Sequence, residues 1–215
     1  MKRTLFALAS SLALLTLPAG AGIVITTNVT DLASSQTSQL IINGTNGVAA
    51  AFTTAGGDTS LYSIQAVLNP VTQAGGLPAP RNITGYNAYL YSDNAGAPGS
   101  LLTAIGTTVN AASTDSLVTF GNNVNYFLQP DTTYFVILKV SNPTYTGLWY
   151  DTSSPVVTSP SGWTIDSGHE LTGSSPTTTL AGDTMLFSVQ TTPEPGTLAL
   201  AGLGAAALWR LRRKA

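Results

Sequence analysis

The single histidine of this 215-residue chain, His169, is the side chain best suited to acid–base chemistry. It lies in the segment Asp166-Ser167-Gly168-His169-Glu170, where a neighbouring carboxylate could orient an imidazole that acts as a base. Gly168 and its polar neighbours also suit a solvated turn, and the sequence has neither a G-x-S-x-G elbow nor a second histidine for a metal centre. We therefore expect a turn here and assign no catalytic residue and no cofactor.

Residues 93–99, DNAGAPG, could bind calcium through Asp93, Asn94 and nearby carbonyl oxygens. An EF-hand loop needs Asp or Asn at alternating positions and a bidentate Glu at the twelfth, and this segment has neither. Its glycines accept a positive φ and its proline presets a turn. We expect a structural turn, after which Leu101 returns to the core, and we keep calcium as the weaker alternative.

Aromatic residues beside a carboxylate are the best candidates for binding a ligand. They are Trp149, Tyr150, Asp151 and Trp163. Ring faces on a β-sheet can stack on sugars while a carboxylate accepts hydroxyl hydrogen bonds, but large aromatic side chains also fill cores, where each buries about 150 to 250 Å². Both alternatives, a ligand platform and a core role, stay open.

The elements that must position these residues are short strands with alternating apolar positions. Tyr62, Ile64, Ala66 and Leu68 share one face of a strand. So do Tyr86, Ala88 and Leu90 in a second strand, and Met185, Phe187 and Val189 in a third. The segment Tyr134–Val140 is apolar on both faces except for Lys139, which predicts a central strand. Further strands are expected at 23–27, 48–53, 117–120, 125–128, 148–150 and 163–165.

No segment before Pro193 has a helical period of useful length, apart from a turn near 31–39. Strands at a spacing of about ten residues favour two packed antiparallel sheets, with a barrel as second choice. We predict an all-β domain at 22–190, an antiparallel β-sandwich of jelly-roll type. Surface loops are expected at 153–161 and 173–179, and a linker at 191–196.

Composition restricts the class of protein. The chain has no cysteine, and charged residues are 8% of it, far below the usual quarter. Between residues 22 and 192, two basic residues face nine acidic ones, a formal charge of −7. Binding to nucleic acid needs Lys and Arg to neutralise phosphates, so that class is excluded.

The N-terminus has the pattern of a secretory signal peptide at 1–21. Lys2 and Arg3 precede an apolar stretch from Leu5 to Leu17, and small residues follow up to Ala21. The apolar stretch is shorter than the roughly 20 residues that span a bilayer. We expect signal peptidase to remove it after passage through the general secretion machinery.

The C-terminus combines three ordered elements within 191–215. Pro193-Glu194-Pro195 precedes an apolar segment at 198–209, and the tail at 210–215 carries the cations Arg210, Arg212, Arg213 and Lys214. These cations stay on the cytoplasmic side by the positive-inside rule, which places the preceding domain outside. A helix of 12 residues covers only about 18 Å, so we expect a short transmembrane helix that anchors weakly.

Together these elements resemble the PEP-CTERM sorting signal of Gram-negative bacteria, which exosortase enzymes of the membrane recognise and cleave. The resemblance implies an exosortase as partner and transient anchoring in the inner membrane. It also implies a final place at the cell surface or in the extracellular matrix.

A second resemblance concerns the domain itself. Residues 89–102, YLYSDNAGAPGSLL, are similar to the "LYSDNxGxPGxLL" pattern of the choice-of-anchor R domain. Phe52 together with residues 62–68 resembles the family's opening strands, and residues 127–136 resemble its "L-x-P-x-T-x-Y" strand. The likeness covers about 49–189 and implies a β-rich module on an exported protein, with no activity to carry over.

These patterns predict an exported protein without catalytic activity that has a structural or interaction role in the exopolysaccharide layer. A carbohydrate-binding surface module is the alternative. A secreted hydrolase is a third, weaker class, because it would need several acids gathered around His169 or Asp151.

Overall fold

The computed structural model describes residues 24–29, 38–43, 46–56, 59–73, 76–79, 84–109, 116–122, 124–153, 156–159, 162–172, 175–179 and 184–193. These residues form strands and no helix. The strands are β1 (Val24–Thr27), β2 (Ser38–Ile42), β3 (Asn46–Thr53), β4 (Thr59–Leu68), β5 (Thr72–Gln73), β6 (Thr84–Asp93), β7 (Pro98–Val109), β8 (Ser116–Phe120), β9 (Tyr126–Leu128), β10 (Thr133–Val140), β11 (Tyr145–Thr152), β12 (Thr164–Thr172), β13 (Ser175–Thr179), β14 (Thr184–Met185) and β15 (Phe187–Pro193).

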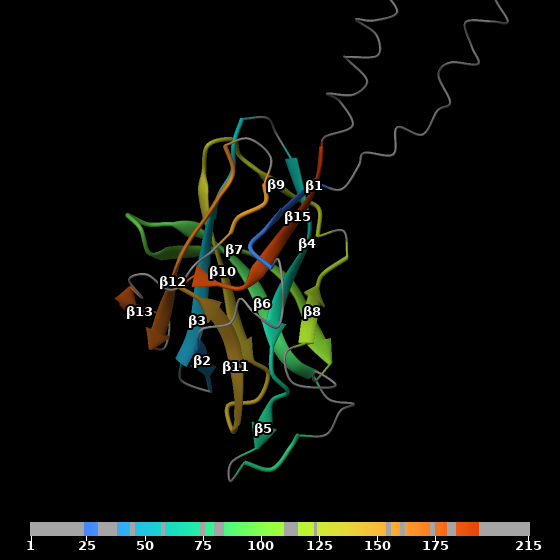
Figure 1. Cartoon of the computed structure of the whole chain (residues 1–215), viewed down its shortest axis with the longest axis vertical. Coiled ribbons are helices and arrows are strands. Elements are labelled where there is room, and N and C mark those ends of the chain that lie inside the picture. The colour runs from blue at the N-terminus through green and yellow to red at the C-terminus, as the bar shows by residue number, and fades with distance from the viewer. Residues whose placement is uncertain are drawn as a thin grey trace, which may run out of the picture. The chain divides into compact units, whose positions relative to one another are not determined.

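The strands form two antiparallel sheets. The six-stranded sheet has the order β13-β12-β3-β10-β6-β7. The nine-stranded sheet follows the path β1-β15-β4-β11-β14, with β2 and β5 paired to β11, and β8 and β9 paired to β4. Figure 1 shows β12 and β13 on one flank of the domain and β4 and β8 on the other. The predicted all-β, antiparallel fold is confirmed, whereas the jelly-roll connectivity stays a prediction.

The core lies between the sheets and confirms the predicted alternation for β6, whereas 184–189 are buried on both faces. Tyr86, Ala88 and Leu90 of β6 are fully buried, and they belong to one hydrophobic cluster with Ile64, Leu68 and Phe187 of the facing sheet. The predicted central strand is also confirmed, because β10 pairs with β3 on one side and with β6 on the other. Its outward residues Phe135 and Ile137 form a second, smaller cluster with Ala49 and Ala51.

Tyr86 connects the two sheets through its phenol. The hydroxyl donates a hydrogen bond to the carbonyl of Asn69 at 2.6 Å and accepts one from the N–H of Leu148 in β11 at 3.1 Å. A Cβ at Gly147 would overlap this ring, so glycine leaves the space that the tyrosine fills. The buried polar group is therefore satisfied, as a sandwich interior requires.

The side chain of Asn28 satisfies backbone groups at the break between β14 and β15. Its side-chain amide donates to the carbonyl of Met185 at 2.8 Å and accepts from the N–H of Phe187 at 2.9 Å. The amide replaces the backbone partner that these groups would otherwise lack. Asn28 is buried, so its amide is not a surface group.

Two expectations about loops are wrong. Residues 166–170 belong to β12 and not to a turn, and residues 175–179 form the edge strand β13 and not a loop. The register of β12 against β3 shifts between Ile165 and Gly168, so a β-bulge explains a glycine that suggested a turn. Residues 38–39, expected near a turn, begin strand β2.

The two ends of the domain pair with each other. β15 continues to Pro193, past the boundary expected at residue 190 and into the expected linker, and Val24 of β1 lies opposite Thr191. Residues Ile23–Thr192 form one compact unit. The part of the chain that the structure describes contains no helix with the length and apolar character needed to cross a bilayer. The signal peptide, Glu194, Pro195, the apolar segment 198–209 and the basic tail with Arg210, Arg212 and Arg213 lie outside the described residues.

Candidate functional site

Trp149 of β11 lies in the core. Its side chain is 0% exposed, and its indole Nε1–H donates to the carbonyl of Leu186 at 3.0 Å. Its ring meets Phe187 edge to face at a centroid distance of 6.1 Å. The ring has no free face for a sugar, so the structure supports the core role that the sequence left open for Trp149.

Trp163 begins a stack of three aromatic rings inside the sandwich. Its ring is parallel to that of Phe52 at 6.3 Å, and Phe52 stacks on Tyr134 at 5.7 Å. Trp163 is 7% exposed. Aromatic pairs of this kind contribute about 0.5 to 1.5 kcal/mol beyond their burial, which supports a stabilising role for this tryptophan.

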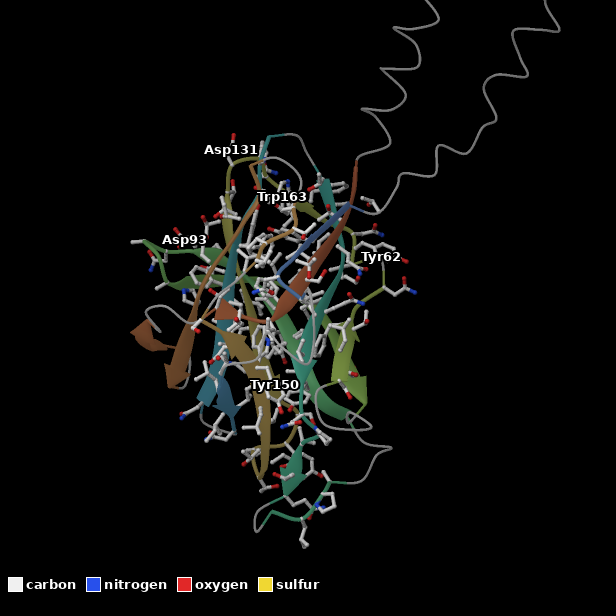
Figure 2. All side chains as sticks on the ribbon, in the orientation of Figure 1. Tyr62, Asp93, Asp131, Tyr150 and Trp163 are labelled. Atoms are coloured by element: carbon white, nitrogen blue, oxygen red, sulfur yellow. The ribbon has the colours of Figure 1, made fainter. Side chains whose placement is uncertain are left out.

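Asp151 and Tyr150 do not complete a site with the tryptophans. Asp151 is 0% exposed and lies opposite Met185 of β14, so its carboxylate is not presented at the surface. Tyr150 is partly buried. Figure 2 shows Tyr150 and Trp163 at well-separated levels of the domain. The four candidate residues therefore do not converge on one surface.

Asp93 and Asn94 form the turn between β6 and β7. Asp93 Oδ1 accepts the N–H of Gly96 at 2.9 Å, and the backbones of Asn94 and Ala97 bond each other at 2.8 and 3.3 Å. Ala95 and Gly96 have φ values of 55° and 83°. No cluster of three or more His, Cys, Asp or Glu that could hold a metal occurs among the described residues. The oxygens of this segment hold the turn together, and Figure 2 shows Asp93 at the rim of the domain.

The segment around His169 lies in strand β12, where the backbone of His169 pairs with two neighbouring strands and the side chain of Asp166 makes hydrogen bonds at the surface. His169 pairs with Ala49 of β3 and Thr179 of β13 through its backbone position, and its side chain is not among those described. Asp166 accepts hydrogen bonds from the hydroxyls of Thr53 at 3.3 Å and Thr164 at 3.5 Å. These residues belong to the six-stranded sheet, whereas Asp151 belongs to the other sheet.

A different group of side chains, which the sequence analysis missed, lies on the outer face of the six-stranded sheet. We call Tyr89 and Tyr91 of β6 with Leu101 and Ala104 of β7 the tyrosine patch. Tyr91 is the Cα partner of Leu101, and Tyr89 is the partner of Ala104. Leu101 was expected in the core but is 54% exposed, because its partner Tyr91 is on the outer face. The alternation that buries Tyr86, Ala88 and Leu90 already implied that Tyr89 and Tyr91 point outward.

The phenol of Tyr91 is held in its neutral form. Partial burial raises the pKa of Tyr91 above its usual value, and the neighbouring phenol of Tyr89 raises it further. A neutral phenol is both a hydrogen-bond donor and an acceptor. The patch therefore combines ring surface with an uncharged polar group.

Comparison with protein families finds a PEP-CTERM protein-sorting motif at residues 191–214. The motif identifies an exported protein that is transiently anchored in the membrane and sorted by an exosortase. It begins inside β15, at the buried residue Thr191. No curated protein sequence matches the chain significantly. The resemblance to the choice-of-anchor R domain stays a prediction.

Solved structures with a similar fold include a variant of the clostridial cysteine protease Cwp84 after propeptide cleavage. The match has a TM-score of 0.52 at 12% identity and covers 80% of this chain and 40% of the protease chain. A second structure comprises the cysteine protease and lectin-like domains of Cwp84, a surface layer associated protein of Clostridium difficile. It matches with a TM-score of 0.48 at 10% identity over 73% of this chain and 36% of that one. At 12% identity the likeness to the first structure shows the fold alone, and the present sequence contains no cysteine.

Proposed function

We propose that the protein is a non-catalytic component of the cell surface or extracellular matrix of a Gram-negative bacterium, with a structural or interaction role in the exopolysaccharide layer. The observation that carries this proposal is the sorting motif at 191–214, whose first residues belong to the last strand of a folded β-domain. Such a chain would bring a folded domain to the cell surface or extracellular matrix after sorting by exosortase.

Within the motif, we assign recognition by exosortase to Pro193, Glu194 and Pro195. The apolar segment 198–209 presents this site in the inner membrane, and Arg210, Arg212 and Arg213 stop transfer on the cytoplasmic side. Signal peptidase acts at the other end, near Ala21. The domain between the two processing sites is then free to leave the membrane.

The arrangement of acids supports a non-catalytic role over the hydrolase alternative. The hydrolase needs carboxylates that converge on one pocket. Asp151 is buried in the nine-stranded sheet, while His169 and Asp166 lie on β12 of the other sheet. The two candidate centres, at Asp151 and at His169, therefore lie on different sheets.

The test is to neutralise the basic tail in the native host. Replacing Arg210, Arg212 and Arg213 by Gln removes three of the four charges that halt transfer and leaves Lys214, so the protein should be released or sorted wrongly. Replacement of the same residues by Lys keeps the charges and is the matched control, which should localise as the natural protein does. Fractionation followed by mass spectrometry of both termini measures the result. Normal processing and location of the Gln variant would contradict the proposed role.

A further inference from the structure

The tyrosine patch forms a continuous strip of apolar and aromatic surface on the β6–β7 hairpin. Tyr89 and Tyr91 are two positions apart on one strand, a separation of about 6.5 to 7 Å on a single face. Opposite them, Leu101 is 54% exposed and Ala104 is also exposed. Each tyrosine thus lies beside an exposed aliphatic side chain on the neighbouring strand.

The strip has a rigid base. Tyr91 packs against a buried cluster of small and large apolar side chains on β3 and β10. That cluster consists of Ala49, Ala51, Phe135 and Ile137. A side chain that is already held in place loses little freedom when a ligand binds, so its contacts contribute more to affinity.

The four side chains of the tyrosine patch are amphipathic and uncharged, and Lys139 of β10, the Cα partner of Asn87, is a cation that borders the strip. Tyrosine rings offer an apolar face and a phenolic O–H, a combination suited to surfaces that are partly apolar and partly wet. Asn87 and Thr107, which pair with each other on the same two strands, extend the strip with amide and hydroxyl groups. A pyranose ring has the complementary pattern of C–H faces surrounded by hydroxyls.

We propose that the tyrosine patch binds neutral polysaccharide, an inference that rests on the proposed place of the protein in a polysaccharide layer. Tyr89 and Tyr91 stack on sugar rings, Leu101 and Ala104 extend the apolar contact, and the phenols exchange hydrogen bonds with hydroxyls. Neutral polymers are favoured over anionic ones because residues 22–192 carry a formal charge of −7, which repels polyanions over about 10 Å at 0.1 M salt.

A second copy of the chain fits the patch less well. Stable protein interfaces bury about 800 Å² on each partner. The tyrosine patch has four side chains, of which both tyrosines are already partly buried. A single sugar residue, by contrast, can be bound by contact with one tyrosine ring.

The test is electrophoresis of the full chain, in a sugar-free detergent, through native gels that contain a polysaccharide. The probes are dextran, hydroxyethyl cellulose, the neutral fraction of the host's own exopolysaccharide, and alginate as the anionic comparison. We expect retardation by at least one neutral probe and none by alginate. Tyr89→Ala and Leu101→Asp should weaken this retardation at least tenfold, whereas Tyr89→Phe should change it less than threefold.

Phe127→Ala is the matched control, because Phe127 is an aromatic residue that is 58% exposed on β9 of the other sheet. It should bind as the natural chain does. Leu101 is exposed, so its variant remains informative should Tyr89→Ala fold poorly.

The proposal is overturned by the absence of retardation in every neutral gel, by equal retardation in alginate, or by equal loss with Phe127→Ala. Dimerisation that Leu101→Asp abolishes, without retardation, would assign the patch to self-association instead. Surface location is measured separately, so failure of the patch leaves the proposed function standing.

Discussion

Tyr86 shows how one polar group can hold a two-layer domain together. Its hydroxyl links Asn69 and Leu148 across the core, and Gly147 gives it room. Burial raises the pKa of Tyr86 above its usual value, although the N–H of Leu148 opposes the shift. The group must stay protonated in the folded state to donate its hydrogen bond.

Tyr86→Phe should therefore lower the free energy of unfolding by about 1 to 3 kcal/mol, because it leaves a buried carbonyl and a buried N–H without their partner. The raised pKa also sets a pH dependence. The stabilisation by the Tyr86 hydroxyl is complete below the pKa of about 10 that this group has in the unfolded chain. It declines as the pH rises towards the higher pKa of Tyr86 in the folded protein. Urea denaturation between pH 7 and 11 measures both effects, and the variant should lose less stability above pH 10 than the natural chain.

Tyr62→Phe is the control for this experiment, because Tyr62 is only partly buried and lies at the edge of the domain (Figure 2). A surface change of this size should alter stability by less than about 0.5 kcal/mol. Equal effects of the two substitutions would show that the bridge across the sheets does not stabilise the fold. Tyr134 is unsuitable as a control, because burial also raises the pKa of Tyr134.

At the scale of elements, the β6–β7 hairpin is the clearest local structure. Its turn uses Asp93 as an acceptor, places Ala95 and Gly96 at positive φ, and closes with Gly99 against the side chain of Ser92. Each of these is an internal contact. The turn therefore needs no ion to hold it.

Asp93→Asn tests this interpretation against a calcium site. An amide oxygen can still accept the N–H of Gly96, so the variant should change stability by less than about 1 kcal/mol. Calcium at millimolar concentration should leave the melting temperature of both proteins unchanged. A rise in melting temperature with calcium that Asp93→Asn abolishes would establish the ion site instead.

The strands show why sequence predicted the centre of the fold better than its edges. β10 is apolar on both faces, so its central place followed from its residues. β13, with the sequence SPTTT, has the composition of a loop, yet an edge strand tolerates proline because one side needs no ladder partner. Gly168 suggested a turn because a bulge and a turn favour the same residue.

The candidate site was harder to predict for a physical reason. The sequence gives the size of an aromatic side chain but not the face of the sheet on which it lies. Trp149 and Trp163 are the largest rings and are buried, whereas Tyr89 and Tyr91 are outside because they alternate with core residues. Strand register, which decides that Leu101 is exposed beside Tyr91, is set by long-range pairing.

At the scale of the whole molecule, the folded domain and the sorting motif share residues. Thr191 and Thr192 belong both to β15 and to the matched motif, and Thr191 is buried opposite Val24. A cut before Thr191 would remove a paired and buried part of the sheet. We predict that the mature protein keeps every residue through Thr192.

Mass spectrometry of the protein recovered from its host measures this boundary directly. The N-terminal fragment serves as internal control, since it should begin near Gly22 if signal peptidase acts as expected. A folded mature protein that ends before Thr192 would contradict the prediction. It would also mean that the last part of β15 is dispensable.

The position of β15 between β1 and β4 has a mechanical consequence. A pull on the end of β15 would load the ladders on both sides, so that β1 and β4 resist it together. Because β1, the first described strand, is one of these neighbours, the first and last strands of the folded domain secure each other. The strand that leads into the sorting motif is therefore held from both sides within the sheet.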